Sequence, residues 1–249
     1  MFTDTHCHIL REYYEDIDCV LASSIKKGVN RFINAAYDEK SILEVIELAG
    51  KYPNVYGAIG IHPSEASFDK SIDLNIIPNN LKKKNIIAIG EIGLDYHYGK
   101  DNMAEQKLLF HQQLEMAVQY HIPVVIHSRE ATEDTINILK QYSVRGVMHS
   151  FSGSYETAKK YIDMGFLLGI NGTVTFKNSH LIEVVKKIGL EHIILETDCP
   201  YLTPEPLRGQ TNNPANISLI AEYIAKNMNI SLPEIAKIID KNMARIFDI

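Results

Sequence analysis

The sequence predicts an α/β protein, a single-domain (β/α)8 barrel of the TIM type over residues 1–249. Eight apolar, β-branched runs are spread over the whole chain, and helical patterns alternate with them. No break in composition marks the start of a second domain, and a length of 249 residues is typical of this barrel. A doubly wound sheet is the main structural alternative.

The predicted strands are short, as expected for a buried parallel sheet. They cover residues 2–9, 31–35, 55–61, 86–91, 122–127, 144–149, 166–170 and 193–198.

The segments between these strands are predicted to be helices. The longest helix is expected over residues 103–120, with an apolar face formed by Leu108, Leu109, Leu114, Ala117 and Val118. Several helices are expected to end at a glycine just before the next strand, a position that favours glycine as a helix C-cap. These glycines are Gly28, Gly50, Gly165 and Gly189.

Composition narrows the class of protein. A hydrophobic content of 45% supports a sizeable core, and no segment is long and apolar enough to predict a membrane span. Three cysteines without CxxC spacing argue against disulfides and thiolate zinc sites, and the chain opens without an export signal, so a cytoplasmic protein is expected. A net charge of −6 argues against non-specific nucleic-acid binding but leaves catalysis on DNA open. No obligate protein partner is evident.

Six polar side chains of the metal-ligating kind occur at the ends of five predicted strands. Because the carboxyl ends of parallel barrel strands converge on one face, these side chains are expected to meet there. Imidazoles and carboxylates together suit borderline or hard divalent cations, so the pattern predicts a metallohydrolase. The six are His6, His8, Glu91, His127, His149 and Asp198.

Two of the carboxylates have predicted catalytic roles. Glu91 lies between two glycines that let the backbone approach a site closely, and its two oxygens could bridge two cations. Asp198 could ligate one cation and accept a proton from the attacking water. Glu196 shares the strand parity of Asp198, so it is either the competing base or a supporting partner.

Three further residues are candidates for binding a substrate phosphate. His62 follows a strand, Arg129 lies two residues beyond His127, and Arg208 is a third candidate for a phosphate contact. Guanidinium groups match phosphate oxygens in pairs.

Five motifs together closely resemble the TatD family, and the resemblance covers nearly the whole chain. They are THCH at 5–8, GEIGLDY at 90–96, IHSR at 126–129, HSFSG at 149–153 and ETDCPYL at 196–202.

The resemblance implies a TIM barrel and a metal-dependent deoxyribonuclease that uses two divalent ions, magnesium, manganese or zinc, to activate water. Glu91 would be shared by both ions; His6, His8 and Asp198 would complete one set, and His127 and His149 the other. DNA would be the substrate, and an exonuclease is expected.

The chain departs from the family pattern at Met148, before the fourth histidine, and after Arg208–Gly209, where Gln210, Thr211 and Asn213 replace a basic-acidic run. These departures leave the ligands intact and point to a smaller or different phosphoester as an alternative substrate. A hydrolase of small phosphoesters, lactones or cyclic amides is therefore the second hypothesis. A metal-stabilised binding or scaffold protein is the third.

Overall fold

The computed structural model describes residues 1–67, 71–97 and 101–249. Strands and helices alternate, and the eight strands follow one another in the sheet in the order β1 to β8. A doubly wound sheet would reverse its order at a switch point, so the sequential order confirms the predicted (β/α)8 fold. The assignment of residues 1–249 to one TatD-like domain stays a prediction.

Two compact units make up the chain, and each is described by itself. Unit 1 contains residues 1–34 and 150–249, and unit 2 contains residues 35–149.

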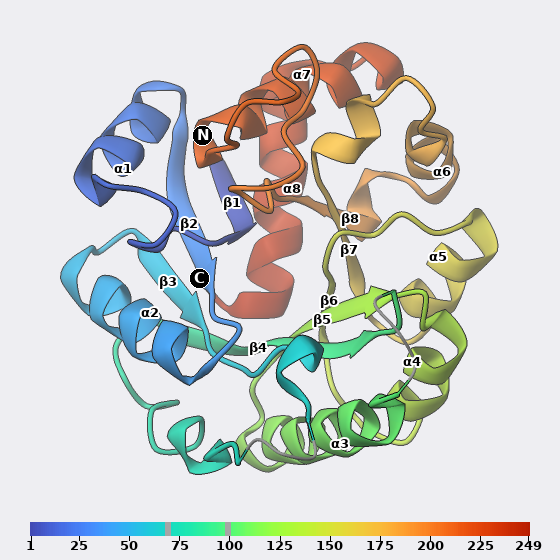
Figure 1. Cartoon of the computed structure of the whole chain (residues 1–249). Helices are drawn as coiled ribbons and strands as arrows, with labels where there is room; N and C mark the ends of the chain where they lie inside the picture. Colours follow the sequence, from blue (N-terminus) through green and yellow to red (C-terminus); the bar gives the residue numbers. More distant parts are fainter. Residues whose placement is uncertain (68–70, 98–100) are drawn as a thin grey trace. The chain divides into compact units, whose positions relative to one another are not determined.

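Unit 1 carries the first two and the last two strands. Its elements are β1 (Phe2–Cys7), α1 (Ile17–Lys26), β2 (Val29–Ala35, whose last residue belongs to unit 2), α5 (Tyr155–Asp163), β7 (Leu167–Ile170), α6 (Leu181–Ile188), β8 (Ile193–Leu195), α7 (Ile217–Met228) and α8 (Leu232–Phe247). In Figure 1, α7 and α8, drawn in orange to red, lie beside β1 and β8.

Backbone hydrogen bonds join the ends of β1 and β8. The N–H of Asp198 donates to the carbonyl of His6 at 3.0 Å, and the N–H of His8 donates to that of Cys199 at 2.8 Å. The carboxyl ends of these two strands are therefore fixed side by side, which brings their polar residues together.

Unit 2 carries the four middle strands. Its elements are α2 (Glu39–Lys51), β3 (Val55–Ala58), β4 (Ile86–Asp95), α3 (Met103–Tyr120), β5 (Val124–Arg129), α4 (Thr132–Leu139) and β6 (Gly146–Met148). Helix α2 begins at a capping box in which Asp38 and Ser41 satisfy each other's backbone N–H groups. It buries Ile42, Val45 and Leu48 at helical spacing. Helix α3 packs against β4 (Figure 1).

Several local predictions are wrong. Strands β1, β3 and β8 end at Cys7, Ala58 and Leu195, before the predicted ends at residues 9, 61 and 198. Gly50 does not end a helix but lies inside α2, whose C-cap is Tyr52, because the helix continues to Lys51. Strand β4 does not end at Glu91 but runs on to Asp95, since residues 92–95 pair with β5. Among the other glycines, Gly189 is the C-cap of α6, as predicted. Gly28 and Gly165 follow their helices at positive φ.

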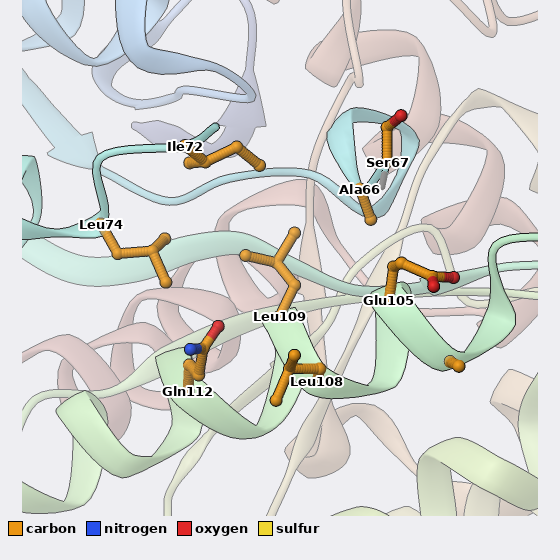
Figure 2. Close-up of a pocket in the computed structure, with 9 residues that line it drawn as sticks. Ala66, Ser67, Ile72, Leu74, Glu105, Leu108, Leu109 and Gln112 are labelled. Atoms are coloured by element: carbon orange, nitrogen blue, oxygen red, sulfur yellow. The ribbon is translucent and has the colours of Figure 1, made fainter. Parts of the chain in front are cut away.

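Unit 2 also contains an apolar pocket of 410 Å³ between α3 and the chain that precedes β4. Figure 2 shows Leu108 and Leu109 of α3 facing it, with Ile72 and Leu74 opposite. None of its described lining residues is a predicted ligand, so we assign it no part in the chemistry. Within the described ranges, no helix has the length and apolar character needed to cross a membrane.

Candidate metal centres

The first donor cluster lies in unit 1, where β1 meets the end of β8. The Nε2 atoms of His6 and His8 are 3.2 Å apart, and the Oδ1 atom of Asp198 lies 3.8 Å from the first and 3.5 Å from the second. Both histidines are buried, and the Asp198 side chain is only 13% exposed. Donors about 2.1 Å from a tetrahedral ion are about 3.4 Å from each other. The three atoms therefore fit a divalent cation.

Backbone conformation places Asp198 in this cluster. It has a φ of 55°, in the left-handed region that aspartate and asparagine tolerate better than most residues. Its N–H is bound to β1 and its carbonyl accepts the N–H of Tyr201, so both sides of this turn are fixed.

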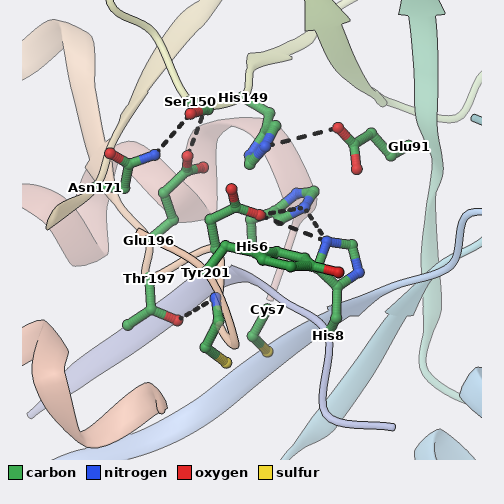
Figure 3. Close-up of polar contacts among 12 residues, drawn as sticks. His6, Cys7, His8, Glu91, His149, Ser150, Asn171, Glu196, Thr197 and Tyr201 are labelled. Atoms are coloured by element: carbon green, nitrogen blue, oxygen red, sulfur yellow. Dashed lines mark hydrogen bonds and ion pairs between the residues drawn. The ribbon is translucent and has the colours of Figure 1, made fainter. Parts of the chain in front are cut away.

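Glu196 has a different environment from Asp198. Its side chain is fully buried, and its Oε1 atom accepts the backbone N–H of Ser150 at 2.6 Å. Figure 3 shows this contact together with Asn171, whose Nδ2 atom donates to the Ser150 hydroxyl at 2.7 Å. A carboxylate held in this way supports the position of its neighbours, which favours the partner role over the base role for Glu196.

The second donor cluster lies in unit 2 around the carboxylate of Glu91. Its Oε1 atom is 2.7 Å from Nδ1 of His127, 3.6 Å from Nε2 of His149 and 3.9 Å from Nε2 of His62. Glu91 is buried. The carboxylate of Glu91 with the imidazoles of His127 and His149 is a ligand set that suits zinc or another transition-metal cation, and His62 lies beside it.

Asp95 supports this cluster and was not among the predicted site residues. Its Oδ2 atom lies 3.0 Å from Nε2 of His127, on the far side of the ring from Glu91. A carboxylate in this position fixes the tautomer and orientation of a ligating imidazole. Glu91, Gly93 and Asp95 are alternate residues of one strand and therefore face the same side of it. Once β4 is extended to residue 95, this spacing indicates that Asp95 lies on the same side as Glu91.

The two carboxylates change the titration of His127. Partial burial lowers its pKa, but hydrogen bonds to Asp95 and Glu91 outweigh burial and raise the pKa to about 9. Burial raises the pKa of Asp95, but its hydrogen bonds to His127 and to the His97 N–H, together with the nearby positive charge, outweigh burial, so its pKa lies below the ordinary value. Without a metal, His127 is thus a cation held between two anions.

We expect the chelated protein to lose stability as the pH rises from about 6.5 to about 9. A folded-state pKa above the unfolded value of 6.5 stabilises the fold fully below pH 6.5, and this contribution disappears as the pH passes the folded pKa. Urea unfolding at pH 6, 7.5 and 9.5, with chelator present, measures it. In His127→Gln the free energy of unfolding should fall less over this pH range. An equal fall in both proteins would contradict the raised pKa of His127.

Gly93 makes room for His127 between β4 and β5. It pairs with His127 in the register, has a φ of 144°, and a Cβ at this position would collide with the His127 carbonyl oxygen. We expect Gly93→Ala to lower the free energy of unfolding by at least about 2 kcal/mol. Gly28→Ala is the control, since Gly28 also has positive φ but has open space around its Cβ position. Equal losses in the two variants would show that the collision contributes nothing.

His62 is oriented by the short turn that follows it. Its Nδ1 atom accepts the backbone N–H of Ser64 at 3.1 Å, which assigns the proton of the neutral ring to Nε2. That nitrogen faces the cluster, and the ring lies 4.5 Å, centroid to centroid, from that of His127. His62 therefore presents an N–H group, a hydrogen-bond donor, at the edge of the second cluster.

The two predicted arginines lie outside both clusters. Arg129 is exposed at the end of β5, opposite Asp95 in the register. Arg208 lies in unit 1 with its guanidinium carbon 4.2 Å from the centre of the Phe176 ring. Their roles in substrate binding stay predictions.

A (β/α)8 chain with histidine and carboxylate clusters at the carboxyl ends of its strands has the architecture of the metal-dependent barrel hydrolases. Comparison with known proteins gives the family. The model described as TatD related DNase matches residues 3–248, so the chain belongs to the TatD family.

Its relatives include YabD of Bacillus subtilis, an uncharacterized metal-dependent hydrolase, 39% identical over 254 residues that span both chains completely. Another, YcfH of Escherichia coli, carries the same description and is 32% identical, over 99% of this chain and 95% of its own. The crystal structure of YjjV, a TatD homologue from Escherichia coli, superposes with a TM-score of 0.92 at 30% identity, over 100% of this chain and 98% of that one. The chain is a metal-dependent hydrolase of this family.

Proposed function

We propose that this hydrolase cleaves phosphodiester bonds of DNA with two divalent cations, one held by each donor cluster. The observation that carries the proposal is the pair of clusters, each with imidazoles around a carboxylate. The description of the matching family model, TatD related DNase, supports DNA as the substrate. A phosphodiester displacement needs stabilisation of both the entering and the leaving oxygen, which two cations provide.

In unit 1 the proposed ligands are Nε2 of His6, Nε2 of His8 and the carboxylate of Asp198. In unit 2 they are Glu91, His127 and His149. Nδ1 of His127 faces Glu91, so this nitrogen would ligate the cation. Nε2 keeps its proton and donates it in a hydrogen bond to Asp95. Ligation displaces the second proton of His127, so metal affinity in unit 2 should increase with pH up to about 9. The shared role of Glu91 stays a prediction.

The side chains around the cations have distinct proposed roles. Bound cations lower the pKa of water and offset the negative charge that develops on the phosphate oxygens. Asp198 accepts the proton of the attacking water, since its carboxylate is partly exposed whereas that of Glu196 is buried against Ser150. The Nε2–H of His62 donates to a phosphate oxygen, and Arg129 and Arg208 bind further phosphate groups of the strand.

The direct test is a time course with single-stranded DNA labelled at one end, in magnesium, manganese or zinc, with the products separated by length. The proposal expects stepwise shortening from one end, as an exonuclease produces. Intact DNA in every metal, from folded and metal-loaded protein, would contradict DNA cleavage.

A second substrate class has one observation in its favour. After Arg208, the residues Gln210, Thr211 and Asn213 carry no charge, and Asn213 is used to cap a 3₁₀ turn by accepting the N–H of Ala215. A loop without cations binds an extended polyanion less strongly. If DNA remains intact, small phosphoesters should be assayed next, followed by lactones and cyclic amides.

A further inference from the structure

A pocket of 650 Å³ in unit 1 contains, among its described lining residues, only one with a role proposed so far, Arg208. Its walls come from three connections that follow successive strands: residues 152–154 after β6, residues 173–181 after β7, and Arg208 after β8. Connections that follow barrel strands form the functional face of the fold. A volume of this size is in the range of small-molecule sites.

The lining of the pocket is cationic although the whole chain has a net charge of −6. Lys177 and Arg208 line it, and none of its described lining residues is a carboxylate. A carboxylate does lie next to the rim, because Glu156 is hydrogen-bonded to Ser154. The charge of the lining therefore favours an anionic ligand.

Two helix N-termini add to this preference. Helix α5 begins after Ser154 and helix α6 after His180, and both of these residues line the pocket. The positive end of a helix dipole attracts a phosphate group.

The pocket also offers a flat surface for stacking. The guanidinium carbon of Arg208 lies 4.2 Å from the centre of the Phe176 ring, a cation–π contact that orients the planar group. Nucleobases stack on aromatic rings and on arginine planes, and both are present here.

Hydrogen bonds hold the walls in place before any ligand binds. The N–H and the hydroxyl of Thr173 both donate to Oδ1 of Asn171, at 3.1 and 2.8 Å. The N–H of Glu205 donates to the Thr175 hydroxyl at 2.9 Å. A Cβ at Gly172 would collide with the carbonyl oxygen of Leu202, so these two connections are closely packed. The pocket is therefore largely preformed.

A short chain of contacts joins the pocket to the metal cluster of unit 1. Asn171 binds Ser150, and Ser150 binds Glu196, two residues before Asp198 (Figure 3). The pocket residues Ser152 and Thr173 lie two residues beyond Ser150 and Asn171, respectively. These hydrogen bonds connect the segments that follow β6 and β7, which also line the pocket, to Glu196 just beyond the end of β8.

We propose that this pocket binds the nucleotide next to the scissile phosphodiester, with its phosphate on Lys177 and Arg208 and its base stacked on the Arg208–Phe176 pair. The inference rests on DNA as the substrate. It adds Lys177 and Phe176 to the residues that contact the strand.

The first test measures binding without catalysis. The probe is fluorescein-labelled hexathymidylate, titrated by fluorescence anisotropy against chelated protein. We expect the double variant Lys177→Gln/Arg208→Gln to raise Kd at least tenfold. The slope of log Kd against log salt should fall by about 0.7 for each phosphate group that the variant no longer neutralises. Phe176→Leu should raise Kd about fivefold or more, since stacking on one aromatic ring accounts for at least that factor.

Lys159→Gln is the matched control. It removes one positive charge from the exposed surface of α5, outside the pocket, as each pocket substitution does inside it, and should leave Kd within twofold of wild type. Thermal melts of all variants establish that each one is folded. Pocket variants that bind the probe as tightly as wild type would overturn the inference, and so would a wild-type protein that does not bind it.

Hydrolysis separates this inference from the proposed function. With metal present, the ratio of kcat/KM for the oligonucleotide to kcat/KM for bis(4-nitrophenyl) phosphate should fall at least tenfold in the double variant. DNA cleavage with an unchanged ratio would leave the proposed function in place and overturn the pocket assignment. Binding of the probe that depends on the pocket, without DNA cleavage in any metal, would leave the pocket assignment in place and overturn the proposed function.

Discussion

We expect Asp198→Asn to lower kcat for the proposed DNA hydrolysis by roughly 10³-fold while the protein remains folded. Asparagine has the same shape and also tolerates the left-handed backbone at this position, where φ is 55°. The change would therefore remove the proposed proton acceptor and one proposed anionic metal ligand without disturbing the turn. Rates under saturating substrate and metal, together with a melting curve, measure the effect.

Asp248→Asn is a close control for this variant. Asp248 is exposed near the carboxyl terminus and has a φ of 56°, so the same substitution is made in the same backbone conformation. Its activity should match wild type. A kcat in Asp198→Asn within threefold of wild type would remove Asp198 from the role of base.

We expect Glu91→Gln to prevent the proposed ion of unit 2 from binding and to lower turnover by at least about 10²-fold. Glu91 is buried and is the only carboxylate of the set it forms with His127 and His149. Without its charge, the two imidazoles have no anionic partner to share the cation. Metal content per chain after gel filtration, measured by mass spectrometry, and kcat are the readouts.

Glu133→Gln, on the exposed surface of α4, is the control and should leave both readouts unchanged. Loss of one ion per chain would mean that Glu91 binds metal in unit 2 alone. Loss of both ions would support the role predicted from the sequence, in which Glu91 is shared by both. Unchanged metal content and activity would contradict every ligand role for Glu91.

Much of the donor set could be predicted because strand periodicity is a local property. In THCH the two histidines have the same parity on β1, and they lie together with their Nε2 atoms 3.2 Å apart. His127, His149 and Glu91 likewise come from predicted strands, and the structure brings them into one cluster. The fold class followed from the same runs, since eight strands alternating with helices leave few topologies.

Other features depend on how distant segments pair, which no local pattern reports. Asp95 was missed because the glycines of residues 90–93 suggested that the strand ended, whereas pairing with β5 extends it. Gly50 was misassigned because α2 tolerates a glycine in its last turn. The pocket around Phe176 and Lys177 is formed by three connections whose conformations depend on one another, so sequence spacing could not reveal it.

The most direct test of the account restores metal to chelated protein while DNA hydrolysis and bound metal are measured in parallel. Wild-type protein, stripped by chelator, is titrated with manganese, and both the metal content per chain and the rate of shortening of end-labelled single-stranded DNA are recorded. We predict no cleavage by the stripped protein and a rate that reaches its maximum as two ions bind per chain. Cleavage at full rate by the stripped protein, or two bound ions with the DNA intact, would contradict it.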